Sequence, residues 1–132
     1  MRGLDTNVLV RYLAADDPRQ TRLVETEFEA SRENEEPFFL SILVLCELVW
    51  VLERSFRQTK AEIVNVLEMV LDSDQFEIEN DPIVRRCVGL YRGGKGHFAD
   101  YVIGEVAREH GCRDTLTFDR DRKNLAGFTL LS

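Results

Sequence analysis

The sequence PFFLSILVLCELVWVLE, residues 37–53, decides what kind of fold this chain forms. Pro37 to Leu40 reads as a short buried strand, and Ser41 is of a residue type that commonly caps the start of a helix. The residues after Ser41 are apolar nearly all round a helix, so we expect that helix to be packed on both sides. A strand that leads straight into a buried helix favours an α/β fold.

Glu47 is a single carboxylate in the middle of this apolar helix. Taking an ionised glutamate out of water is costly unless a positive group meets it. We therefore expect Glu47 to be protonated, paired with a cation or bound to a metal ion. Which of these applies depends on the groups that share its surroundings.

Length and composition indicate a single globular domain covering residues 1–132, with 44% hydrophobic and 31% charged residues. No basic leader precedes an apolar segment, and no apolar run is long enough to cross a bilayer. We therefore expect a cytoplasmic protein with no membrane partner. The net charge of −7 would repel a polyanion over most of the surface, although acids that bind divalent cations reverse the local sign.

The cysteines do not predict a disulfide framework or a zinc site. Cys46, Cys87 and Cys112 are odd in number and widely spaced, and at least two of them fall on apolar helix faces. His97 and His110 are too few and too far from them to complete a zinc finger. We expect buried, reduced thiols that pack as small hydrophobic groups.

Short strands alternate with helices along the whole chain. Asp17-Pro18 is a clear helix start, and residues 59–62 have the spacing of a capping box. We expect a polar loop at 31–36 and a turn-rich break at 92–96. The remaining segments predict strands at 1–4, 37–40, 76–79, 114–118 and 128–131, separated by helices in a parallel α/β sandwich.

Four acids fall at positions where a solvated charge is not the simplest interpretation. Asp5 and Asp119 each follow a strand, and ligands of parallel sheets bind beyond the carboxyl ends of the strands. Glu47 and Asp100 lie on the apolar sides of helices. Two alternatives remain open: Asp5 as a helix cap, and Asp119 as an ordinary turn residue.

No obvious set of buried arginines would pair these acids, so the sequence suggests a divalent cation site. Mg²⁺ and Mn²⁺ prefer hard oxygen ligands and keep several waters, so a few carboxylates hold them. Ions held in this way polarise a phosphoryl oxygen and supply a hydroxide-like nucleophile. Hydrolysis of a phosphodiester is the reaction that such a site serves best.

The sequence comes close to two other known motifs, and we reject both. The segment 89–96 nearly matches a Walker A loop, but Gly96 replaces the Ser or Thr that would hold Mg²⁺, and a helix precedes it. Asp5-Thr6-Asn7 resembles the start of aspartyl-phosphate phosphatases, but Asn7 cannot act as the general acid.

Together, several motifs in their order along the chain resemble PIN-domain nucleases: Leu4-Asp-Thr-Asn-Val-Leu-Val-Arg-Tyr-Leu13, the acid Glu47, Phe98-Ala-Asp100 and Thr117-Phe-Asp119. The length and the Asp16-Asp-Pro18 segment look most like VapC-type toxins of bacterial toxin–antitoxin pairs. The resemblance runs from end to end. It implies a three-layer α/β/α PIN-like fold with a short-stranded parallel sheet.

The resemblance also implies roles for particular residues. The catalytic, metal-binding set would be Asp5, Glu47, Asp100 and Asp119, holding Mg²⁺ or Mn²⁺. Thr6 or Asn7 and Thr117 would orient ligands or water, and Asp121 would substitute for or assist Asp119.

His97 stands where many relatives carry an acid, so it would alter metal affinity, contact the substrate, or be a loop residue with no catalytic role. Basic residues that flank the expected site are candidates for gripping substrate, with solvated surface charge as the alternative for most of them: Arg92, Lys95, Arg120 and Arg122.

The function implied by the resemblance is a metal-dependent endoribonuclease that is the toxin of a toxin–antitoxin pair. It would cut an RNA substrate, form a homodimer, and be inhibited by a small antitoxin protein lying along helices near the active site. Two alternatives remain. One is a catalytically inactive PIN-fold binding module whose partner surface lies around Trp50 and Leu67, and the other is a DNA-directed PIN nuclease.

Overall fold

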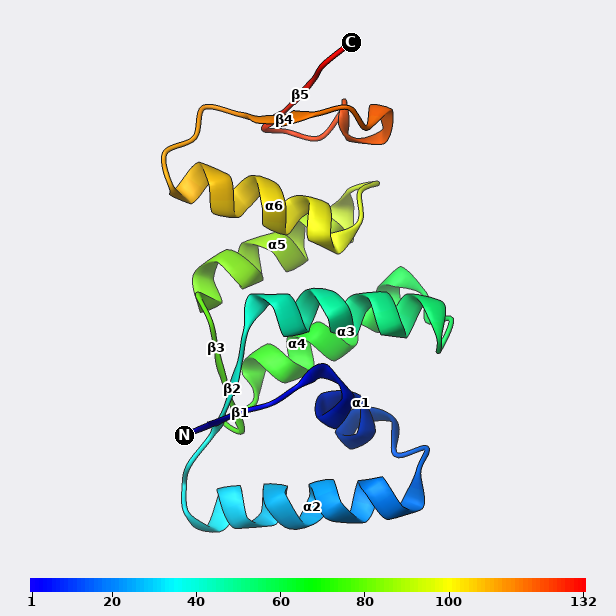
Figure 1. The fold of residues 1–132 in the computed structure, drawn as a ribbon, viewed down its shortest axis with the longest axis vertical. Helices are drawn as coiled ribbons and strands as arrows, with labels where there is room; N and C mark the ends of the chain where they lie inside the picture. The colour runs from blue at the N-terminus through cyan, green and yellow to red at the C-terminus, as the bar shows by residue number, and fades with distance from the viewer. The chain divides into compact units, whose positions relative to one another are not determined.

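A computed structural model describes residues 1–132 and divides the chain into two compact units, Met1–Asp81 and Pro82–Ser132. The chain forms six α-helices and five short strands, with two α-helices between each successive pair of the first four strands, and all the strand pairs are parallel (Figure 1). The α/β class expected from the sequence is therefore confirmed. No helix has both the length and the apolar character needed to cross a membrane.

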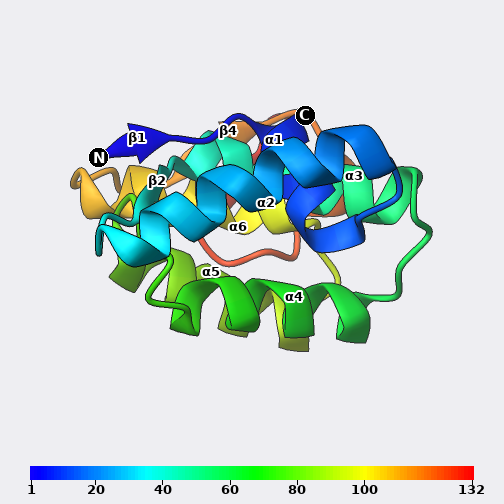
Figure 2. The same ribbon diagram turned by 90° about the horizontal axis from the view of Figure 1, so that it is seen from below.

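The first unit holds a three-stranded parallel sheet in the order β1-β2-β3, with Arg2 opposite Phe38 and Phe38 opposite Phe76. Figure 1 shows α1 between α2 and α3, and Figure 2 shows α2 and α4 well apart. The elements are β1 (Arg2–Gly3), α1 (Thr6–Ala14), α2 (Pro18–Glu33), β2 (Phe38–Leu40), α3 (Ile42–Arg54), α4 (Lys60–Asp72) and β3 (Phe76–Ile78).

The predicted helix starts of this unit are confirmed by side-chain caps. Asp17 accepts hydrogen bonds from two backbone amides of the first turn of α2, and Ser41 accepts one from the Val44 amide at 3.2 Å. Thr59 and Glu62 form the predicted capping box at the start of α4. These short polar side chains satisfy amides that have no partner inside the helix, which fixes where each helix begins.

The polar loop expected at 31–36 begins later than predicted, because α2 continues to Glu33. Ser31 is buried, and its hydroxyl donates a hydrogen bond to the Glu36 carbonyl at 2.5 Å. This bond ties the end of the helix to the turn that leads into β2.

Aromatic rings join α1 and α2 to the sheet. The rings of Tyr12 and Phe28 stack with centroids 3.9 Å apart, and Phe28 also packs against Phe38 at 4.7 Å and Phe76 at 5.9 Å. Phe28 is almost completely buried, so this cluster anchors α2 on the strands.

The prediction that α3 is packed on both sides is wrong. Its buried face includes Leu45, Leu48 and Leu52, but Leu43 and Trp50 on the other face are 69% and 58% exposed. Leu67, which the sequence suggested as part of a partner surface, is instead fully buried in α4.

The second unit pairs β4 with β5 in parallel, with Thr115 opposite Phe128 and Thr117 opposite Leu130. Its helices meet where the Tyr91 and Phe98 rings contact edge to face, with centroids 5.8 Å apart. The elements are α5 (Asp81–Gly93), α6 (Phe98–Glu109), β4 (Thr115–Thr117), the 3-10 helix η1 (Arg120–Arg122) and β5 (Phe128–Leu130).

The break predicted at 92–96 is shorter than expected, because α5 continues through Gly93. Gly94 follows at a close approach: a Cβ there would lie 2.9 Å from the Leu90 carbonyl oxygen and nearer still to the Tyr101 hydroxyl. The Tyr101 hydroxyl accepts a hydrogen bond from the Gly96 amide at 3.0 Å. Only a glycine fits at position 94 without moving these groups.

All three cysteines are free, as expected, but they differ in exposure. Cys87 is buried, Cys46 is partly buried and Cys112 is exposed, so the expectation of buried thiols is wrong for Cys112. Burial raises the pKa of Cys46 to about 11, with a further contribution from the neighbouring charge of Glu47.

Candidate metal site

Asp5 and Glu47 are linked in the first unit through one buried side chain. Asp5 caps α1, and its Oδ1 accepts a hydrogen bond from the Thr6 amide at 2.8 Å. Thr6 is 6% exposed, and its hydroxyl donates to Glu47 Oε1 at 2.9 Å. Thr6 thus contacts both carboxylates, one through its backbone and one through its side chain.

Glu47 is exposed, so the argument that its charge must be compensated does not hold. Its place in the structure still distinguishes it from a simple surface acid, because the buried Thr6 hydroxyl orients its carboxylate. The second oxygens of Glu47 and Asp5 make no hydrogen bond within the protein. Asn7, one residue beyond Thr6, is exposed and takes no part in these contacts.

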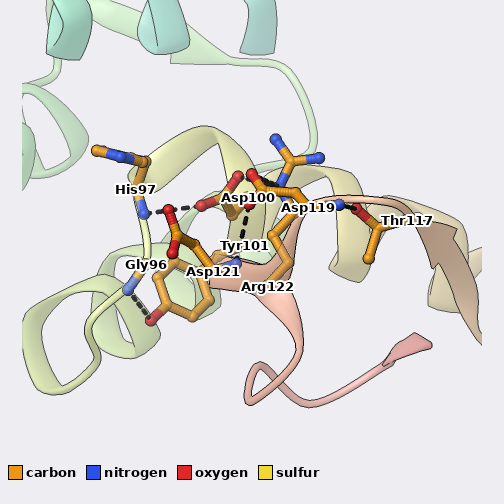
Figure 3. Close-up of polar contacts among 8 residues, drawn as sticks. All are labelled: Gly96, His97, Asp100, Tyr101, Thr117, Asp119, Asp121 and Arg122. Carbon is orange, nitrogen blue, oxygen red and sulfur yellow. Dashed lines mark hydrogen bonds and ion pairs between the residues drawn. The ribbon is translucent and has the colours of Figure 1, made fainter. Parts of the chain in front are cut away.

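Asp100 is buried in the second unit, as its helical position predicted, with only 5% of the residue exposed. It lies in the first turn of α6, where its Oδ2 accepts a hydrogen bond from the His97 amide at 2.9 Å (Figure 3). Its Oδ1 accepts one from Arg122 Nε at 2.7 Å. The expectation that no arginine pairs these acids is therefore wrong for Asp100.

Asp119 approaches the same Nε atom of Arg122 as Asp100 does (Figure 3). Its Oδ2 is 3.8 Å from Arg122 Nε, and its Oδ1 accepts a hydrogen bond from the Asp121 amide at 2.9 Å, which caps η1. The buried Thr117 hydroxyl accepts one from the Asp119 amide at 3.0 Å. In this unit Thr117 holds the turn that carries Asp119, and Asp121 contributes its backbone to that turn.

The basic residues suggested for substrate binding lie at the surface. His97 sits at the start of α6 and contacts Asp100 through its backbone amide. His97 is exposed, and so are Arg92, Lys95 and Arg120. Arg122 differs from them because it is partly buried and paired. Its guanidinium carbon also lies 5.8 Å from the centroid of the Phe128 ring.

The donor chemistry of both units fits a hard divalent cation. Apart from the Arg122 guanidinium, which cannot bind a metal ion, the groups gathered are carboxylates and hydroxyls. This set of oxygen ligands suits Mg²⁺ or Mn²⁺ better than zinc. Within neither unit do three His, Cys, Asp or Glu side chains converge. Each unit brings two of the four acids into one local arrangement.

The sequence model of the PIN domain family matches residues 4–127. The chain belongs to the PIN domain family. Among curated proteins, this PIN-domain chain is 30% identical over 125 residues to the VapC ribonuclease of Aquifex aeolicus (strain VF5), which covers 95% of the chain and 92% of that protein. No solved structure matches. The family resemblance and fold class inferred from the sequence are thus confirmed.

Proposed function

We propose that this PIN-domain protein is a metal-dependent endoribonuclease that hydrolyses RNA phosphodiester bonds with a metal-activated water. The observation that carries the proposal is the similarity to a VapC ribonuclease over 95% of the chain. The two pairs of acids, Asp5–Glu47 and Asp100–Asp119, also support the proposal, because they offer carboxylate oxygens as ligands to a divalent cation.

The proposed catalytic set consists of Asp5, Glu47, Asp100 and Asp119. The family match supports one domain that includes both compact units, since it spans residues 4–127. A bound Mg²⁺ or Mn²⁺ would supply an activated water and polarise the scissile phosphate. Thr6 orients Glu47, and Thr117 holds the Asp119 turn. Hydrogen bonds that hold metal ligands in place in this way commonly set the affinity of a metal site.

The proposal extends to partners. We propose a toxin role, with a small antitoxin protein as inhibitor and the cytoplasm as its place of action, as the resemblance to VapC-type toxins implies. The similarity to a protein named VapC ribonuclease supports RNA as the substrate. We propose a homodimer as the functional form, as the resemblance to VapC-type toxins implies. His97, Arg92, Lys95 and Arg120 remain proposed substrate contacts, and their exposure leaves them accessible to an RNA strand.

RNA cleavage by the purified full chain tests the proposal. We expect cleavage that requires Mn²⁺ or Mg²⁺ and that falls at least ~100-fold in Glu47→Gln and Asp100→Asn, because each change removes a ligand charge. Glu29→Gln is the matched control, since Glu29 is an exposed glutamate on α2 in the same unit as Glu47. Cleavage by both site variants at the wild-type rate would rule out the assigned site.

One observation favours the non-catalytic alternative. Leu43 and Trp50 are exposed on the same face of α3 as Glu47, so this face also suits a protein partner. Growth arrest on expression that is lost in Asp5→Ala, with the protein still folded, would favour catalysis over binding. Cleavage of single-stranded DNA in place of RNA would instead support the DNA-directed alternative.

A further inference from the structure

Arg122 is the cation that the structure places against both Asp100 and Asp119. Its Nε lies 2.7 Å from Asp100 Oδ1 and 3.8 Å from Asp119 Oδ2 (Figure 3). The Asp100 side chain is only 7% exposed, and the Arg122 side chain is 28% exposed. Ion pairs between fully solvated side chains contribute little, but this pair is largely withdrawn from water.

The position of Arg122 is set by its surroundings. It is the last residue of η1, a 3-10 helix capped by the Asp119 side chain. Asp119 lies just before this single turn and Arg122 lies at its end, which brings the Arg122 Nε to 3.8 Å from Asp119 Oδ2. The Phe128 ring of β5 packs against the guanidinium at 5.8 Å, which limits the directions in which the side chain can point.

The contact has opposite consequences for the protein with and without a metal ion. Without a metal, Arg122 supplies the positive charge that a buried carboxylate such as Asp100 needs. With a metal, the same guanidinium competes for Asp100 Oδ1 and repels a divalent cation that approaches Asp119. One side chain therefore stabilises the metal-free fold and weakens metal binding.

We propose that Arg122 is a built-in counter-ion of the Asp100–Asp119 pair, and that a divalent cation binds these acids only in competition with its guanidinium. The inference rests on the proposed function, because it assumes that Asp100 and Asp119 are metal ligands. It adds a residue that sets the ion concentration at which the enzyme becomes active. Arg122 acts on the metal through the two carboxylates and is therefore a positioning residue.

Two measurements on the full chain test the inference without using activity. We expect Arg122→Gln to bind Mn²⁺ alone, titrated by calorimetry, about 10-fold or more tightly than wild type, because the change removes a positive charge beside both carboxylates and frees Asp100 Oδ1. In EDTA its melting temperature should fall by roughly 5 °C, because Asp100 loses its partner. Lys123→Gln is the matched control: it removes one positive charge from an exposed neighbour, and we expect both quantities to stay at their wild-type values.

Arg122→Lys covers the case in which Arg122→Gln does not fold in EDTA. Lysine keeps the charge but lacks the planar Nε–H donor, so we expect Mn²⁺ affinity between those of wild type and Arg122→Gln. Equal or weaker Mn²⁺ binding by both Arg122 variants, with wild type binding normally, would overturn the inference alone. If neither wild type nor any variant binds Mn²⁺, the proposed metal site fails and the inference falls with it.

Discussion

Replacing Thr6 by valine removes a single hydrogen bond and leaves the shape of the side chain almost unchanged. Thr6 is buried, and its hydroxyl donates to Glu47 Oε1 at 2.9 Å. Valine is also branched at Cβ, so the first turn of α1 and its Asp5 cap should be retained. The substitution therefore isolates the orientation of the Glu47 carboxylate.

The two expected effects of Thr6→Val differ in size. A hydrogen bond to a charged acceptor contributes about 1.5–3 kcal/mol, but Glu47 is exposed and water can replace the lost donor. We therefore expect a loss of only about 1 kcal/mol in the free energy of unfolding, or roughly 4 °C in melting temperature. Removing a hydrogen bond that orients a metal ligand weakens metal binding about 10–100-fold, which is about 1.4–2.8 kcal/mol. Metal affinity should thus fall more than stability.

Mn²⁺ calorimetry and thermal melting in EDTA measure these two quantities on the same sample. Thr6→Ser is the control, because it keeps the hydroxyl and loses a methyl group worth about 0.8 kcal/mol of stability. We expect serine to lower stability as much as valine does, while keeping the Mn²⁺ affinity of wild type. If valine binds Mn²⁺ as tightly as wild type, or serine binds it as weakly as valine, Thr6 does not orient a metal ligand.

Two further predictions concern packing and thiol chemistry. Gly94→Ala should destabilise the protein by about 1–3 kcal/mol in urea unfolding, because the added Cβ would collide with the Tyr101 hydroxyl. Gly89→Ala is the control, since a Cβ there meets open space and should leave stability unchanged or raise it. Equal effects of the two substitutions would contradict this packing. Burial raises the pKa of Cys46 to about 11, because the fold favours its neutral thiol. The stability that the buried neutral thiol contributes is therefore present below pH 9 and is lost as the pH rises toward 11. Alkylation at pH 8 should therefore reach the exposed Cys112 well before Cys46, and the reverse order would refute this ranking.

Most element boundaries could be predicted because residues next to each boundary determine them. Asp17, Ser41 and Thr59 cap their helices through amides only two or three residues away. The true end of α2 was not predictable in this way, because it depends on the burial of Ser31 and on its bond to the Glu36 carbonyl. Local chemistry is visible in a sequence, but burial is a property of the whole fold.

The site was predicted as a set of residues and not as a set of contacts. The apolar composition of α3 concealed its exposed face, because Leu43 and Trp50 are apolar and yet point to solvent. The Arg122–Asp100 pair joins residues 22 positions apart, and no local pattern indicates it. The one available signal was the spacing of three between Asp119 and Arg122, which matters only once a helical turn is known to lie there.

Three of the four acids also have a structural task. Asp5 caps α1, Asp119 caps η1, and Asp100 accepts the His97 amide at the start of α6. Selection for folding alone would therefore preserve these three aspartates even in a homologue without nuclease activity. Glu47 lies in the middle of an exposed helix face and caps nothing, so it is the acid most free to drift once the chemistry is lost. On the proposed function, in which Glu47 binds the metal ion, the identity of the residue at position 47 should therefore distinguish active from inactive PIN-domain sequences of this kind better than the three aspartates do.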